Sequence, residues 1–320
     1  MTPLTHPRKS PRAKLGGRRW WWPAGFFVAC LAIAVALAAA MPAWAGQDAQ
    51  AATDHLGAQG GRRLALLVGV GSFADPAFTS LSYAHNDVAA MQKWLTSPEG
   101  GGFRKRDVTV LLDGQATRAA IMGQAQRLAE QTGPEDLVLL YFSTHGFLTT
   151  EQVAGVVCYD TRSTGHLDSS GSPIVFRDQS LTRDDLYHFL AGLPAQRRAV
   201  IVDICHGGQL AGEKTPAEAN TTGGERVQAS GNPMRTTLVL ASCLGSERSW
   251  ESRELESSIF THYILEGLKK FHGDLVAAFN LAREETERQS KCEKGICQTP
   301  YLVRQPPDRG LSLAPPRREG

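Results

Sequence analysis

The sequence predicts an α/β protein in which helices cover both faces of a mostly parallel sheet, giving three layers. Two uninterrupted apolar runs, residues 137–142 and 199–202, have the composition of strands that are buried on both faces. Other segments carry apolar residues at helical spacing, and they alternate with further short apolar runs. Strands that alternate with helices are typical of a parallel sheet between two helical layers.

The expected elements follow this alternation along the chain. Thr117 and Thr182 are suited to cap the helices that they precede, and Pro300 fits a strand at the edge of a sheet. The predicted strands cover 62–71, 107–112, 136–146, 153–160, 199–204, 235–242 and 298–303. The predicted helices are one ending at Leu95 and those over 117–131, 182–193, 258–270 and 274–288. We expect residues 161–179 to form a polar loop beside a cleft.

The first 61 residues differ from the rest. Six basic residues and no acidic one precede Trp20, and an apolar run over 24–40 leads to Ala43-Trp44-Ala45. This order is typical of a secretory signal peptide over 1–45, cleaved after Ala45. Arg18-Arg19 before three tryptophans leaves twin-arginine export open, and the length of the run leaves an uncleaved membrane anchor open. We therefore expect export to the periplasm or beyond, with 46–61 as a flexible tether.

The remainder forms the expected domain, over residues 62–305, with a C-terminal tail over 306–320. The chain from Trp20 onward carries 28 basic and 32 acidic residues, which give no reason to expect nucleic-acid binding. Within it, residues 211–234 hold glycines and prolines without any apolar period, so they are predicted to be an internal linker.

The cysteines are interpreted for an exported protein. Cys292 and Cys297 are close together in a polar stretch, and we pair them in a disulfide. Cys158 is expected in the core. A zinc site is not expected, because no C-x-x-C occurs and His145, Cys205 and His206 lack the usual ligand spacing.

Two of the predicted strands end in residues that suit covalent catalysis. Cys205 comes three residues after the run 199–202, and His145 comes three residues after the run 137–142. Parallel strands would bring both to one edge of the sheet, where such sheets bind ligands. A cysteine nucleophile needs a nearby histidine to take its proton, so we predict Cys205 as the nucleophile and His145 as the general base. The backbone N–H groups of Gly146 and Cys205 are the expected oxyanion hole, and the adjacent His206 is given a structural role.

These motifs resemble a known family. Ser143-Thr144-His145-Gly146 is similar to the Ser-Gly-His-Gly of caspase-like peptidases. Asp203-Ile204-Cys205-His206-Gly207-Gly208 resembles the Asp-x-Cys-His-Ser-Gly of metacaspases and their bacterial relatives. The chain departs from these motifs at Thr144 and Gly207, which are both small residues. The resemblance runs from about Arg62 to Arg304 and implies the caspase-like three-layer fold. It also implies that residues 211–234 separate a larger from a smaller segment.

The resemblance further implies a preference for basic residues. Asp203 stands where caspases carry glutamine, and together with Asp87 it would form a pocket for arginine or lysine before the scissile bond. Ser143 and Cys243 are expected beside this pocket. The alternative for Asp87 is a cap on its own helix.

Calcium is the one cofactor that the resemblance raises. Asp184 and Asp185 match the paired aspartates of the metacaspase calcium site, and Asp160 is a third candidate ligand. Where the family has a further aspartate, this chain has Gly212, and Glu213 follows one place later. The Cys-His chemistry itself requires no cofactor.

Two functions follow as hypotheses. The first is a cysteine endopeptidase that cleaves proteins or peptides after arginine or lysine. The second is a catalytically silent caspase-like module that binds peptides or partners. A hydrolase of other acyl substrates remains open, because a Cys-His pair alone does not specify the acyl group.

Overall fold

The computed structural model describes residues 61–316 except 150, 152, 169–170 and 213–235. Six strands form the central sheet in the order β13-β10-β9-β3-β1-β2. Five of them run parallel, and β13 pairs antiparallel with β10 at one edge. The strands are β1 (Arg63–Gly69), β2 (Val108–Leu112), β3 (Leu137–Ser143), β9 (Arg197–Asp203), β10 (Thr236–Ala241) and β13 (Tyr301–Gln305). The predicted mostly parallel α/β sheet is confirmed.

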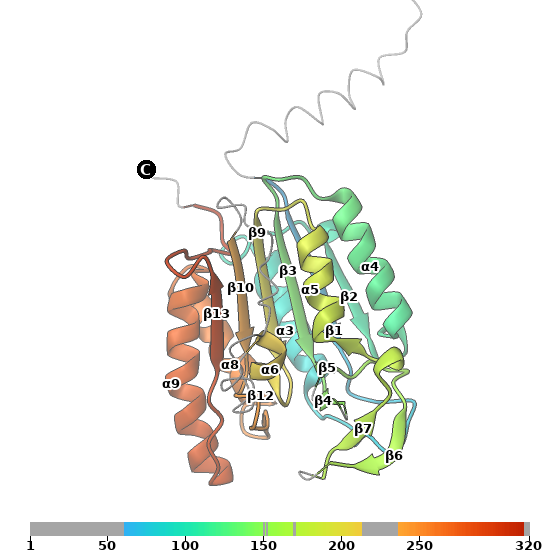
Figure 1. The fold of residues 1–320 in the computed structure, drawn as a ribbon. Coiled ribbons are helices and arrows are strands. Elements are labelled where there is room, and N and C mark those ends of the chain that lie inside the picture. Colours follow the sequence, from blue (N-terminus) through green and yellow to red (C-terminus); the bar gives the residue numbers. More distant parts are fainter. Residues whose placement is uncertain (1–60, 150, 152, 169–170, 213–235, 317–320) are drawn as a thin grey trace, which may run out of the picture. The chain divides into compact units, whose positions relative to one another are not determined.

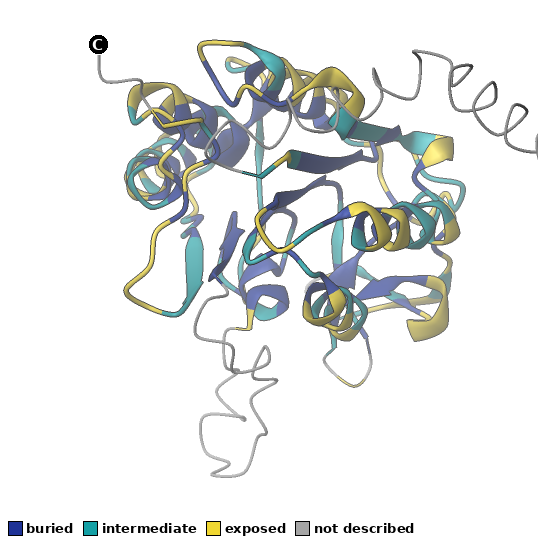
Figure 2. Ribbon diagram, turned by 90° about the horizontal axis from the view of Figure 1, so that it is seen from above, coloured by how far each residue is buried: buried dark blue, intermediate teal, exposed yellow. Residues whose placement is uncertain are grey.

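Helices cover both faces of the sheet (Figure 1). α3 (Ala84–Thr96), α8 (Ile259–Lys270) and α9 (Leu275–Lys294) pack on one face, and α4 (Arg118–Gln131), α5 (Arg183–Gly192) and α6 (Gly207–Ala211) pack on the other. Successive strand residues point to opposite faces, so each central strand contributes to two separate cores. Seen from above, buried strands lie between helices whose outer sides are exposed (Figure 2).

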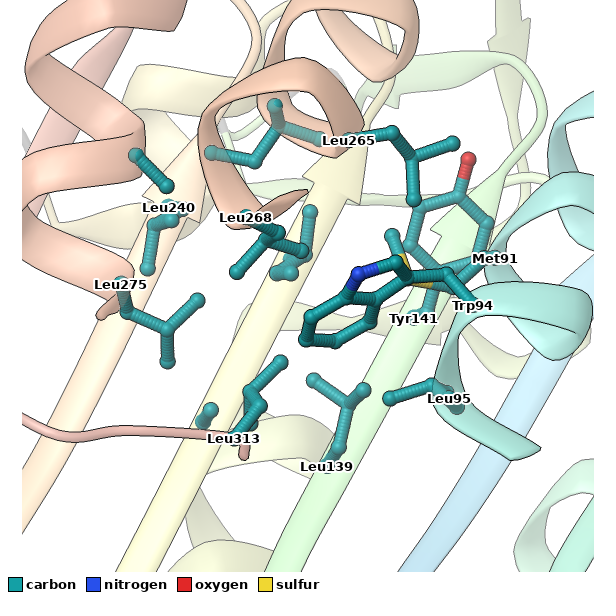
Figure 3. Close-up of a cluster of buried hydrophobic side chains, with 14 of the residues drawn as sticks. Met91, Trp94, Leu95, Leu139, Tyr141, Leu240, Leu265, Leu268, Leu275 and Leu313 are labelled. Atoms are coloured by element: carbon teal, nitrogen blue, oxygen red, sulfur yellow. The ribbon is translucent and has the colours of Figure 1, made fainter. Parts of the chain in front are cut away.

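The core under α3, α8 and α9 gathers residues that are distant in sequence (Figure 3). Trp94 of α3 and Leu268 of α8 lie over Leu139 and Tyr141 of β3. Leu313 also belongs to this core, and its N–H donates to the Gly273 carbonyl at 2.9 Å. Within the predicted C-terminal tail, the apolar side chains of Leu311 and Leu313 are therefore buried against the start of α9.

Both predicted threonine caps are confirmed. The Thr117 hydroxyl accepts from the N–H of Ala120 at 3.2 Å. Thr182 and Asp185 form a reciprocal capping box at the start of α5. Because each cap satisfies backbone donors that a helix leaves unpaired, the sequence defines these starts well.

Three local expectations need correction. Residues 161–179 are not merely a loop, because they contain the hairpin of β6 (Ser163–Leu167) and β7 (Pro173–Val175). α9 extends to Lys294 and ends at Gly295, whose φ of 68° suits a glycine C-cap. Cys292 therefore lies within a helix, and both Cys292 and Cys297 are free thiols instead of the predicted disulfide.

Short strands surround the carboxyl ends of the central strands. β4 (Gly146–Leu148), β5 (Ala154–Val156) and β8 (Leu181–Thr182) form one small sheet, and β11 (Glu251–Ser252) pairs with β12 (Ser257–Ser258). Among the helices of the described residues, none is both long and apolar enough to cross a bilayer. The predicted signal peptide and almost all of the tether and of the internal linker lie outside the described residues.

Candidate active site

The pairing of β3 with β9 brings the two predicted catalytic residues to one edge of the sheet. Ser143 is directly opposite Asp203, and each is the last residue of its strand. His145 and Cys205 both come two residues later. Parallel pairing in this register therefore places the imidazole and the thiol on adjacent loops, as the sequence predicts.

The backbone between these loops is in close contact at Gly146. A Cβ at this position would lie 1.8 Å from the Cys205 carbonyl oxygen, so only glycine fits. The His145 carbonyl accepts from the N–H of Val157 at 2.9 Å, which makes the next pair, Gly146 with Val156, a non-hydrogen-bonded pair of the β4–β5 ladder. The Gly146 N–H is thus free of that ladder.

The His145 ring is oriented by its neighbours. Its Nε2 lies 2.7 Å from the Thr79 carbonyl oxygen, and its face stacks on Phe73 with ring centroids 5.0 Å apart. A carbonyl can only accept a hydrogen bond, so this contact assigns the proton to Nε2 and leaves Nδ1 as the basic nitrogen. Burial lowers the pKa of His145, which favours the neutral imidazole.

The Cys205 thiol is partly exposed, and its Sγ lies 4.0 Å from the Ser249 carbonyl oxygen. Burial raises the pKa of the Cys205 thiol. The uncharged thiol and the uncharged imidazole are therefore the favoured forms in the free protein. A base that takes the thiol proton is consequently needed before the sulfur can act as a nucleophile.

The turn after Cys205 is made by His206, whose backbone is left-handed with φ 59°. Gly207 then begins α6. His206 Nδ1 lies 2.7 Å from the Gly245 carbonyl oxygen, so this buried ring is bound to the neighbouring loop. These contacts are those of a structural histidine.

The two predicted pocket acids lie deep in the same edge. Asp203 is 4% exposed and Asp87 is 1% exposed. Asp87 accepts from the hydroxyls of Ser143 at 2.9 Å and Ser257 at 2.6 Å. Its carboxylate therefore faces β3 and β12. Asp87 does not cap its own helix, which was the alternative role for this residue.

Asp203 is surrounded by donors from the segment after the internal linker. Its Oδ1 accepts from the Ser249 hydroxyl at 2.6 Å, and its Oδ2 accepts from the Ser258 hydroxyl and from the N–H and hydroxyl of Thr261. Burial, with the nearby negative charge of Asp203, raises the pKa of Asp87 to about 7. The negative charge of Asp203 therefore affects the protonation of Asp87.

Cys243 and Cys158 are both buried. The Cys243 thiol lies 3.3 Å from the Ile204 carbonyl oxygen and 3.4 Å from that of Glu247, and burial raises its pKa well above the ordinary value. Cys243 therefore packs behind the nucleophile loop, whereas the sequence places it in the substrate pocket. Cys158 belongs to the core under α4 and α5.

Several contacting groups had no sequence signal. The Thr79 carbonyl is a backbone group, and any residue could supply it. The serines at 249, 257 and 258 were visible as a cluster, but their spacing matches no motif. Only the packing of this segment on β3 and β9 shows that they hold the acid pair.

Comparison with known proteins agrees with this geometry. The sequence profile of the caspase domain matches residues 62–309. The chain belongs to the caspase-domain family. Peptidases of this family are cysteine-type, and both Cys205 and His145 lie within the matched residues.

The relatives are distant. Over 157 residues the chain is 31% identical to Metacaspase-1B of Aspergillus fumigatus, which covers 46% of this chain and 36% of that protein. Over 159 residues it is 28% identical to Metacaspase-1 of Saccharomyces cerevisiae, covering 47% of this chain and 34% of that protein. The aligned part thus spans about a third of the length of these relatives.

Solved structures show the same fold. Caspase-1 from Spodoptera frugiperda superposes with a TM-score of 0.51 at 17% identity, covering 77% of this chain and 87% of that one. A protein from Geobacter sulfurreducens gives a TM-score of 0.53 at 18% identity, covering 76% and 93% of the two chains. The predicted caspase-like architecture is confirmed.

The candidate calcium ligands are bound by the chain's own donors. The Arg118 N–H donates to Asp160 at 2.8 Å, and its guanidinium lies 3.3 Å from Asp185. Arg177 contacts Asp184 at 2.7 Å. Calcium needs six to eight converging oxygens, and in the described part of the chain no three His, Cys, Asp or Glu side chains group closely enough to hold a metal. These residues as placed do not fit a calcium ion.

Proposed function

We propose that this caspase domain is a cysteine endopeptidase that cleaves after arginine or lysine. The observation that carries the proposal is the contact of Gly146 with Cys205, which joins the His145 loop to the nucleophile loop. In this proposal His145 Nδ1 takes the Sγ proton, and the thiolate attacks the scissile carbonyl carbon. The N–H groups of Gly146 and Cys205 stabilise the oxyanion, and His145 returns the proton to the leaving amine. Water then hydrolyses the thioester.

The acid pair supports the preference for a basic residue. Asp87 and Asp203 occupy the same edge as Cys205, and two close carboxylates favour a cation. The experiment is hydrolysis of matched fluorogenic peptides ending in Arg, Lys or Asp by the purified protein, with and without EDTA. We expect cleavage of the Arg and Lys peptides at the same rate in EDTA, because no step of the chemistry uses a metal. If a folded protein cleaved none of the peptides, the silent binding module would be supported instead.

We also propose that the protein processes itself in the internal linker. Lys214 and Arg226 lie within the linker and Arg235 lies just beyond it, outside the described residues. A peptidase that prefers basic residues is expected to cut at Lys214 or Arg226. Intact-mass spectrometry should show two fragments for the wild type and one chain for Cys205→Ala. Identical intact masses under conditions of peptide hydrolysis would contradict this proposal.

Export is proposed from the basic start, the apolar run and Ala43-Trp44-Ala45. N-terminal sequencing of protein from its native host should begin at Gly46. Recovery of Met1 or Thr2 in a membrane fraction would instead support an uncleaved anchor.

A further inference from the structure

One short segment contacts every part of the candidate site. Residues 247–258 follow the internal linker and include β11 and β12. Ser249 contacts Cys205 through its carbonyl and Asp203 through its hydroxyl, and Ser257 donates to Asp87. These contacts reach the nucleophile and the acid pair. Contact with the histidine side of the site is made by Glu251.

The Glu251 carboxylate binds a distant part of the backbone with both oxygens. Its Oε2 accepts from the N–H of Ser82 at 2.9 Å, and its Oε1 accepts from the N–H of Tyr83 at 2.7 Å. Charged acceptors make stronger hydrogen bonds than neutral ones, and two parallel bonds also fix direction. The carboxylate therefore fixes the backbone immediately before α3.

This backbone belongs to the loop that orients His145. Thr79, whose carbonyl contacts His145 Nε2, lies three residues before Ser82. The other end of the loop is fixed by Asp113, whose Oδ1 accepts from the N–H groups of Gly71 at 2.8 Å and Ser72 at 3.1 Å. The loop over 71–83 is thus attached at both ends by carboxylates. Of these two carboxylates, that of Glu251 binds the residues nearer to Thr79 in sequence.

Glu251 also acts on the imidazole through its charge. The pKa of His145 is lowered mainly by burial, and the Thr79 carbonyl and the negative charge of Glu251 oppose this effect. The positive charge of Arg248 acts in the same direction as burial. Removal of the Glu251 charge should therefore favour the neutral imidazole further.

We propose that Glu251 is a positioning residue for His145, acting through the loop that presents the Thr79 carbonyl. The inference rests on the proposed Cys-His peptidase and adds a residue that does not contact the reacting atoms. Glu251 fixes residues 82 and 83, these fix Thr79, and Thr79 holds the ring so that Nδ1 remains the base. No family motif quoted for this chain includes Glu251.

The test compares Glu251→Gln with Glu254→Gln in the full chain. Glutamine keeps the size of the side chain but lacks the charge and the second acceptor oxygen, so its amide would meet a backbone N–H. We expect kcat on an Arg peptide to fall by about 10-fold to 100-fold, because small misplacements of a catalytic group have effects of this size. KM should change by less than about twofold, because the acid pair is untouched. Glu254 is exposed on the turn between β11 and β12, so Glu254→Gln is the matched loss of charge and should leave both constants unchanged.

A second measurement reports on His145 directly. NMR titration of the imidazoles in a Cys205→Ala background should show His145 titrating at lower pH when Glu251→Gln is added. A role limited to stability would lower the melting temperature without this change. Glu251→Asp keeps the charge on a shorter side chain, so we expect an intermediate kcat and a His145 titration close to that of the parent. Glu251→Asp also provides the comparison if Glu251→Gln does not fold.

The outcomes separate this inference from the proposed function. A wild-type protein without peptidase activity would contradict the function, and the His145 titration would still test the positioning role. Equal kcat values for Glu251→Gln and Glu254→Gln, with an unchanged His145 titration, would overturn the inference.

Discussion

Cys205→Ala is expected to abolish peptide hydrolysis, with kcat/KM lower by about 1000-fold or more, because no other group supplies the attacking sulfur. His145→Ala should have an effect of similar size. Burial raises the pKa of the Cys205 thiol, so the thiolate does not form readily without a base. The measurement is hydrolysis of an Arg peptide by each variant, with circular dichroism to show that the fold is retained.

Cys243→Ala is the control for this prediction. It removes a buried thiol that packs behind the nucleophile loop, so activity should persist even if the melting temperature falls. Loss of activity in Cys243→Ala together with full activity in Cys205→Ala would show that the nucleophile is misassigned.

Asp203→Asn should lower kcat/KM for Arg peptides by about 100-fold, the effect of leaving a buried cation without its charged partner. The wild type should prefer Arg to Lys, because a planar guanidinium can contact both carboxylates whereas an ammonium is a single point charge. An Asp peptide would meet like charge and should be cleaved at least about 100-fold more slowly than an Arg peptide. The exposed Asp308 supplies the matched control, Asp308→Asn, which should not change these rates.

The same pocket should make binding depend on pH. The pKa of Asp87 is raised to about 7, so its carboxyl gains a proton as the pH falls through 7. A protonated acid attracts a guanidinium less strongly, and KM for Arg peptides should therefore rise on the acid side of this value. The pH dependence is measured as KM for an Arg peptide at pH values on both sides of about 7. The specificity is measured as kcat/KM for matched Arg, Lys and Asp peptides on the wild type and Asp203→Asn. Equal cleavage of the Asp and Arg peptides would exclude the acid pair as the specificity pocket.

Much of the fold was predictable because the central strands are continuous apolar runs. Residues 137–142 and 199–202 can be buried on both faces only in the middle of a helix-covered sheet. The C-terminal end of α9 and the hairpin over 163–175 were missed for a different reason. Polar residues such as those around Cys292 suit both an exposed helical end and a loop, and only the position of the C-cap at Gly295 decides between them.

The candidate site was predictable where a reactive side chain follows a strand that the sequence itself identifies. Cys205 and His145 follow the two buried strands, and the pairing of Ser143 with Asp203 brings them to one edge. Glu251 and the Thr79 carbonyl could not be predicted, because their contacts join segments far apart in sequence through backbone groups. Such contacts depend on tertiary packing and leave no pattern in residue types.

The pairing of β10 with β9 has a consequence for any cut in the internal linker. β10 follows the linker and β9 precedes it, yet the two strands pair over six residues in the interior of the sheet. The later part of the chain also supplies β13 at the edge of that sheet, and α8 and α9, which pack on one of its faces. Two fragments joined in this way should copurify and elute from a sizing column as one species. Separation would require a denaturant, since parting them would expose the core of the domain to water.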